Sequence, residues 1–166
     1  PYVTHNFMAN LWEQAGPSLA EQATDAAHEA IDKSGVPFVL TARAECFLVP
    51  HDNPMNDALQ RIKAYEAAGA DCLYVPGLKT REQINRLLET VTKPVNVLVG
   101  MRGFDIPLSE LETMGVRRIS TGGSVMCATL GLVRDAVSGL GEDRLDYLNG
   151  MIPHAKLTEI FGKRNQ

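Results

Sequence analysis

An arginine and a glutamate lie two residues apart at the end of an apolar run of this sequence. Residues 37–42 read Pro-Phe-Val-Leu-Thr-Ala, and Arg43, Ala44 and Glu45 follow directly. In layered α/β proteins, the loops at the carboxyl ends of the strands hold the substrate. A guanidinium can bind a carboxylate or a phosphate through two parallel hydrogen bonds. Arg43 is therefore a candidate anchor for a small anion; the alternative is an arginine that only pairs with a neighbouring acid.

Glu45 points to the same side as Arg43 if the backbone stays extended, because side chains alternate along a strand. Its carboxylate could orient Arg43, act as a base, or bind a metal-bound water. A simple ion pair between the two side chains is an equally good interpretation. We therefore take Arg43 and Glu45 together as the candidate catalytic residues.

A second candidate site is the segment Ser120, Thr121, Gly122 and Gly123, between an apolar run and a helical pattern. Backbone N–H groups at the start of a helix attract anions, so these residues could bind a carboxylate or a phosphate. The alternative is that the glycines only allow a tight strand-to-helix turn. Cys46 and His51 lie in the loop after Arg43, where a packed thiol and a solvated imidazole are the simpler interpretations.

The pattern of apolar residues predicts alternating strands and helices. Strands are expected to start near residues 37, 72, 95 and 117, and helices to cover residues 17–34, 56–68, 80–91, 107–114, 124–139 and 153–161. Thr80 and Gln83 have the spacing of a capping box. Alternation of this kind indicates parallel strands joined by right-handed crossovers. We expect one domain over residues 1–166, with irregular structure or a short helix around residues 7–14 in its first 16 residues.

Four strand–helix units do not close an eight-stranded barrel. The first and last strands would leave apolar edges with unpaired backbone groups. Either the strands pair with other segments, or the chain forms a small open sheet.

The overall composition is that of an ordinary globular protein, with 45% hydrophobic and 22% charged residues among 166. A net charge of −4 offers no basic surface for nucleic acid. No apolar run approaches the ~18 residues of a membrane span, and no signal peptide is visible. The three cysteines form no Cys-x-x-Cys pair. We therefore expect a cytoplasmic protein that binds neither nucleic acid nor membrane.

Three segments together resemble the isocitrate lyase and phosphoenolpyruvate mutase superfamily. They are residues 36–45 (VPFVLTARAE), residues 58–71 (ALQRIKAYEAAGAD) and residues 115–120 (GVRRIS), and the resemblance extends over about residues 18–140. It implies a (β/α)8 barrel of the TIM type, to which this chain supplies four strand–helix units, strands five to eight. It also implies that the terminal helix in residues 150–166 is exchanged between subunits of a homodimer or homotetramer.

The resemblance further implies a Mg²⁺-dependent lyase or mutase that acts on a small 2-oxo acid or phosphono acid. Such an enzyme cleaves or forms a C–C or P–C bond through an enolate. Arg43 matches the family arginine that grips the carboxylate or phosphonate, and Glu45 matches the acidic position two residues later.

The chain departs from the family in several places. The metal-binding carboxylates and the mobile catalytic loop precede the arginine strand in the family, and they are not seen in this sequence. Pro76-Gly77 stands where methylisocitrate lyases carry a glutamate, and an apolar residue near Leu98 replaces an asparagine. These differences argue against a methylisocitrate-like substrate, and no metal ligand is assigned to this chain.

Two other interpretations remain open. The chain could be a catalytically silent half-barrel that works as an interaction or structural module, with its strand edges paired to a partner. It could also be a small phosphate-binding α/β domain that uses Gly122 and Gly123.

Overall fold

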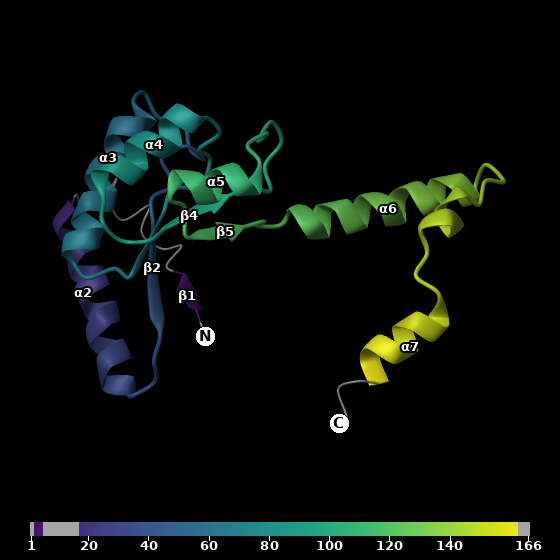
Figure 1. Cartoon of the computed structure of the whole chain (residues 1–166), viewed down its shortest axis with the longest axis horizontal. Helices are drawn as coiled ribbons and strands as arrows, with labels where there is room; N and C mark the ends of the chain where they lie inside the picture. Colours follow the sequence, from purple (N-terminus) through teal and green to yellow (C-terminus); the bar gives the residue numbers. More distant parts are fainter. Residues whose placement is uncertain (1, 5–16, 163–166) are drawn as a thin grey trace. The chain divides into compact units, whose positions relative to one another are not determined.

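The computed structural model describes residues 2–4 and 17–162, with side chains from residue 22 onward (Figure 1). The chain forms two compact units, Pro1–Gly122 and Gly123–Gln166. Each unit is a separate body with its own secondary structure, and each is described by itself.

The first unit is built on a five-stranded parallel sheet of order β1-β2-β3-β4-β5. The strands are β1 (Tyr2–Thr4), β2 (Val39–Arg43), β3 (Cys72–Tyr74), β4 (Val95–Leu98) and β5 (Arg118–Ser120). The helices between them are α2 (Pro17–Ser34), α3 (Pro54–Ala67), α4 (Arg81–Thr90) and α5 (Leu108–Met114). All four expected strands are confirmed, and so are the helices expected between them.

Strand β1 corrects the expectation of irregular structure in the first 16 residues. Tyr2 pairs with Val39 and Thr4 with Thr41, so this short segment adds a parallel strand beside β2. Three residues are too few to reveal a period of two in the sequence. The helix considered around residues 7–14 lies outside the described residues.

The sheet has two chemically different faces, because side chains alternate along each strand. Ala42, Leu73, Val75, Val95 and Val97 point to one face and belong to the buried core. Helices α3, α4 and α5 contribute the other half of that core; their buried residues include Ala58, Ile62, Tyr65, Ile84, Leu87 and Leu111. Burial of each large aliphatic side chain stabilises the fold by about 1.5–3 kcal/mol. The opposite face carries Thr41, Arg43, Cys72, Tyr74, Asn96 and Ser120.

Two turns fix the loops around the sheet. The expected capping box at the start of α4 is confirmed, with the Thr80 side chain accepting from the N–H of Gln83. Gly77, in the turn after β3, has φ +100°, and a Cβ there would lie 2.5 Å from Cβ of Phe47. Phe47 belongs to the loop after β2, so Gly77 lets this loop pack closely against the end of β3.

The second unit contains α6 (Ser124–Leu140), a 3-10 helix η1 (Asp146–Gly150) and α7 (His154–Gly162). The helices expected at 124–139 and 153–161 are confirmed, and η1 is an addition to the prediction. Many large apolar side chains of the second unit are exposed; they include Val125, Met126, Leu130, Leu132, Val133, Val137, Ile160 and Phe161. Among the described residues, no helix is long and apolar enough to cross a membrane.

We expect Gly77→Ala to destabilise the fold by about 2–4 kcal/mol, because the alanine adds both left-handed strain and a collision with Phe47. Urea unfolding followed by circular dichroism measures the effect. Gly103→Ala is the matched control: its φ is +82°, but nothing lies within 4 Å of the new methyl group. Equal losses in the two variants would contradict the role assigned to the Phe47 contact.

Candidate functional site

Four side chains form a row across the polar face of the sheet. Arg43 ends β2 and pairs in register with Tyr74, which ends β3. Tyr74 pairs with Asn96 of β4, and Asn96 pairs with Arg118 of β5. Residues in register on parallel strands point to the same face, so the four side chains share the face of the sheet opposite the helices. Arg43 and Tyr74 are the last residues of their strands, and α/β proteins bind ligands at this carboxyl edge of the sheet.

The guanidinium of Arg43 is held by two neighbours. Its Nη2 lies 2.6 Å from Oε1 of Glu45, and both side chains are largely buried, at 19% and 22% exposure. Its central carbon lies 5.3 Å from the centre of the Tyr74 ring, within the range of a cation–π contact. The structure thus brings the two predicted catalytic residues together as an ion pair. The arginine is oriented by a carboxylate on one side and an aromatic ring beneath it.

The carboxylate of Asp57 organises the loop between β2 and α3. Its Oδ2 accepts hydrogen bonds from Nε of Arg61 at 2.8 Å and from Sγ of Cys46 at 3.2 Å. Nε2 of His51 lies 3.0 Å from the same oxygen, and Nδ1 of His51 accepts from the N–H of Asn53. The loop that begins with Glu45 is therefore tied at several points to the first turn of α3.

Sequence analysis did not single out Asp57 or Arg61. Asp57 and Arg61 are four residues apart on a helix, a spacing at which acidic and basic side chains form ion pairs. This spacing was the signal in the sequence that could have predicted the pair. The convergence of Cys46 and His51 on the same carboxylate depends on the path of the loop and is visible only in three dimensions.

The electrostatics of this cluster are set by burial and by Arg61. Burial acts to raise the pKa of Asp57, but the hydrogen bonds from Arg61 and Cys46 outweigh it and leave the pKa below its ordinary value. Burial, together with the bond to Asp57, raises the pKa of the Cys46 thiol to about 12. Cys46 is therefore a protonated donor at neutral pH rather than a nucleophile.

The predicted anion-binding segment begins at the end of strand β5. Ser120 ends β5, and its Oγ accepts a hydrogen bond from Nδ2 of Asn96 at 3.0 Å. Thr121 follows, and Gly122 has φ +55° with Cδ1 of Leu98 3.1 Å from where a Cβ would stand. Gly123 belongs to the second unit as the N-cap of α6. The first three of these residues thus lie at the same sheet edge as Arg43, and Gly123 is placed in the other unit.

Asn96 is a site residue that sequence reasoning missed. Its side chain is buried at 1% exposure, and within the described part of the chain its Oδ1 has no hydrogen-bond partner. The signal in the sequence that could have identified it was a polar amide residue inside the apolar run of residues 94–99.

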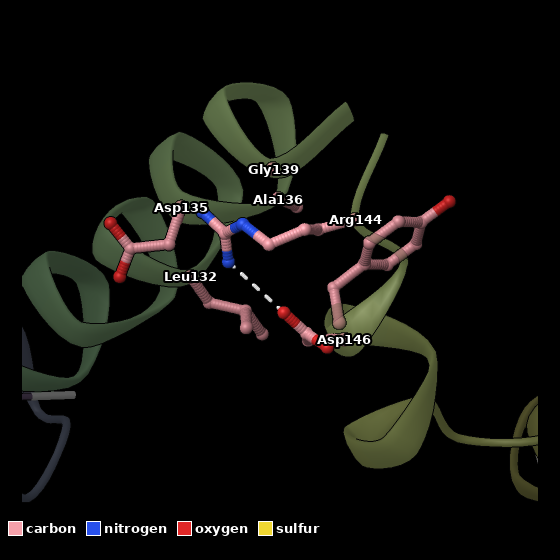
Figure 2. A pocket seen from close by; sticks show the side chains of 7 residues that line it. Leu132, Asp135, Ala136, Gly139, Arg144 and Asp146 are labelled. Atoms are coloured by element: carbon pink, nitrogen blue, oxygen red, sulfur yellow. Dashed lines mark hydrogen bonds and ion pairs between the residues drawn. The ribbon is translucent and has the colours of Figure 1, made fainter. Parts of the chain in front are cut away.

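A hollow on the second unit is an alternative location for an anion-binding site (Figure 2). It has a volume of about 240 Å³ and is lined by Leu132, Asp135, Ala136, Gly139, Arg144, Asp146 and Tyr147. Its only cationic lining residue, Arg144, already pairs with Glu142 at 2.7 Å and with Asp146 at 3.0 Å. Because acidic side chains surround this arginine, the hollow is poorly suited to an anion.

No group of three His, Cys, Asp or Glu side chains that could hold a metal occurs in the described ranges.

Comparison with known proteins relates the chain to phosphoenolpyruvate phosphomutase and to enzymes similar to it. The sequence profile of phosphoenolpyruvate phosphomutase matches residues 10–140. The phosphoenolpyruvate phosphomutase of Streptomyces hygroscopicus is 30% identical over 128 residues, which cover 75% of this chain and 40% of that protein. An oxaloacetate decarboxylase of Paraburkholderia xenovorans (strain LB400) is 32% identical over 85 residues, which cover 51% of this chain and 28% of that enzyme.

A solved structure from Burkholderia cenocepacia J2315, provisionally named a lyase/mutase, superposes with a TM-score of 0.81 at 33% identity. The match covers 86% of this chain and 52% of that protein. The chain thus spans about half the length of the solved relative and less of these two curated ones.

We expect Asp57→Asn to lower the free energy of unfolding at pH 7 by about 3 kcal/mol, because Arg61, only 4% exposed, would lose its counter-charge. A carboxyl whose pKa is lowered by folding stabilises the protein above its unfolded pKa, near 3.8, and this contribution disappears as the pH falls through the folded value. The difference between variant and wild type should therefore shrink on acidification. Urea unfolding at pH 7 and at pH 3 measures it.

Asp105→Asn serves as the matched control, because the side chain of Asp105 is 82% exposed. It should change stability by less than about 0.5 kcal/mol at either pH. A difference between Asp57→Asn and wild type that stays constant with pH would show that the carboxylate charge is not the cause.

Proposed function

The chain belongs to the phosphoenolpyruvate mutase family of the isocitrate lyase superfamily, and from this premise we propose that it is part of a lyase or mutase acting on a small 2-oxo acid or phosphono acid. The reaction would cleave or form a C–C or P–C bond through an enolate. One observation carries the proposal: a partly buried arginine, paired with a glutamate at 2.6 Å, stands at the carboxyl end of a parallel strand.

We propose that strands β2–β5 are strands five to eight of a (β/α)8 barrel, with residues 1–166 forming its carboxyl-terminal half. The two-faced sheet supports this, because the strands of such a barrel turn one face to the helices and the other to the barrel interior. The match to about half of a solved relative agrees with it. Strand β1 would be the strand that precedes the arginine strand.

In this proposal Arg43 binds the carboxylate or phosphonate, and Glu45 holds the guanidinium in the binding orientation. A fixed cation next to the developing enolate lowers the barrier, because it stabilises charge that grows in the transition state. Tyr74 limits the movement of the guanidinium from below. Ser120, Thr121 and Gly122 would contribute polar groups at the same edge, and Gly123 would join them if α6 follows on the barrel.

Mg²⁺ is the cofactor that the family resemblance implies. The described residues do not fit such a site by themselves, since no three candidate ligands converge among them. The ion would therefore be held by residues outside the described ranges, and the role of this half is to position the substrate.

Assembly is also part of the proposal. The exposed apolar side chains of α6 and α7, such as Leu130, Ile160 and Phe161, need a covering surface. A homodimer or homotetramer in which residues 150–166 are exchanged between subunits would supply it. A catalytically silent half-barrel is disfavoured, because two matched relatives are named as enzymes acting on small acids.

We expect Arg43→Gln to weaken oxalate binding at least tenfold, because it removes a charged hydrogen-bond partner worth about 1.5–3 kcal/mol. Isothermal titration calorimetry on the protein expressed from its complete gene, in the presence of MgCl₂, measures the affinity. Arg81→Gln, a change at an exposed arginine that pairs with Glu110, is the control and should leave binding unchanged. Oxalate affinity that is unaltered in Arg43→Gln would refute the proposed role.

A further inference from the structure

The side-chain amide of Asn96 forms a hydrogen bond through its nitrogen but not through its oxygen. Its Nδ2 donates to Oγ of Ser120 at 3.0 Å, while its Oδ1 has no hydrogen-bond partner within the part of the chain that the structure describes. The side chain is 1% exposed, so it is almost completely buried. Buried amide oxygens are nearly always hydrogen-bonded, because an unmet acceptor loses the bonds it makes in water. An unsatisfied acceptor in the middle of a sheet therefore needs an explanation.

The position of this acceptor points to the ligand site. Asn96 shares a cross-strand row with Arg43, with Tyr74 on the strand between them. Two strand spacings place the Cα atoms of Arg43 and Asn96 about 10 Å apart. Both side chains point to the same face, so a small molecule held by Arg43 can extend along that face toward the amide.

The bond to Ser120 decides which end of the amide is available. In the structure Nδ2 is engaged with Oγ of Ser120 on the neighbouring strand, so Oδ1 is the end of the amide that remains available. The available group is then an acceptor, and an acceptor cannot pair with a carboxylate or an ionised phosphonate oxygen. It requires a donor on the ligand, and a hydroxyl group is a donor that many small acids carry.

We propose that Asn96 is a specificity-determining residue whose Oδ1 accepts a hydrogen bond from a hydroxyl group of the ligand that Arg43 anchors. The site then prefers a small hydroxy acid to the same acid without the hydroxyl. This inference rests on the proposed function, since it takes Arg43 as the anchor. The selectivity comes from the acceptor, which stays unpaired when the ligand lacks the donor.

The test compares malonate with hydroxymalonate, which differ by a single hydroxyl group. Isothermal titration calorimetry on the protein expressed from its complete gene gives both affinities for each variant. The wild type should bind hydroxymalonate at least fivefold more tightly, the lower end of the effect of pairing a buried acceptor. Asn96→Leu should bind malonate within about twofold of wild type and lose the preference, because leucine fills the space without an acceptor.

Thr41→Val is the matched control. Thr41 is buried on the same face of the sheet, but its register partner is Cys72, so it lies one row further from the strand ends. This variant should keep the preference for hydroxymalonate. Circular dichroism and thermal melting establish that each variant is folded, and Asn96→Ala, which also lacks the acceptor, decides the matter if Asn96→Leu does not fold.

The results separate this inference from the function on which it rests. A wild type without the preference, or an Asn96 variant that keeps it, overturns the role of Asn96. If Arg43→Gln weakens both ligands in that case, the anchor stands and only the hydroxyl contact fails. If Arg43→Gln weakens neither ligand, the proposed function itself fails.

Discussion

The alternation of side chains along parallel strands in register is the constraint on which the rest of this structure depends. It sends Ala42, Leu73 and Val95 into the helix-covered core, and it sends their neighbours Arg43, Tyr74 and Asn96 to the opposite face. The free energy gained by burying the apolar face therefore decides which side chains lie on the polar face. A one-residue slip of any strand would exchange the two faces, so the core specifies the register and the register places the site.

The loop after β2 fixes the orientation of the Arg43 side chain. Gly77 allows Phe47 to pack against the end of β3, and Asp57 ties Cys46 and His51 to α3. Glu45 directly precedes Cys46 and Phe47, and it pairs with Arg43. Close packing at Gly77 and the partly buried carboxylate of Asp57 thus fix the loop whose first residue, Glu45, orients the guanidinium of Arg43.

Much of the first unit could be predicted from sequence, because its strands and helices carry strong local signals. The apolar runs, the capping box at Thr80 and the glycine after Met114 mark their elements well. Strand β1 was missed because three residues show no period, and η1 because one short turn does not either. At the site, strand alternation predicted that Arg43 and Glu45 lie on the same side, and the ion pair between them was one of the alternatives left open. The meeting of Cys46 and His51 on Asp57, and the bond from Asn96 to Ser120, depend on loop paths and strand neighbours that a single sequence does not reveal.

The central claim is that Arg43 presents its guanidinium to a small acid at the carboxyl ends of the strands. A crystal structure of the complete protein with bound oxalate tests it most directly. Our account predicts a carboxylate of oxalate within hydrogen-bond distance of the Arg43 guanidinium, above the Tyr74 ring and on the Asn96 face of the sheet. Oxalate bound elsewhere, with the Arg43 side chain directed away from it, would contradict the account.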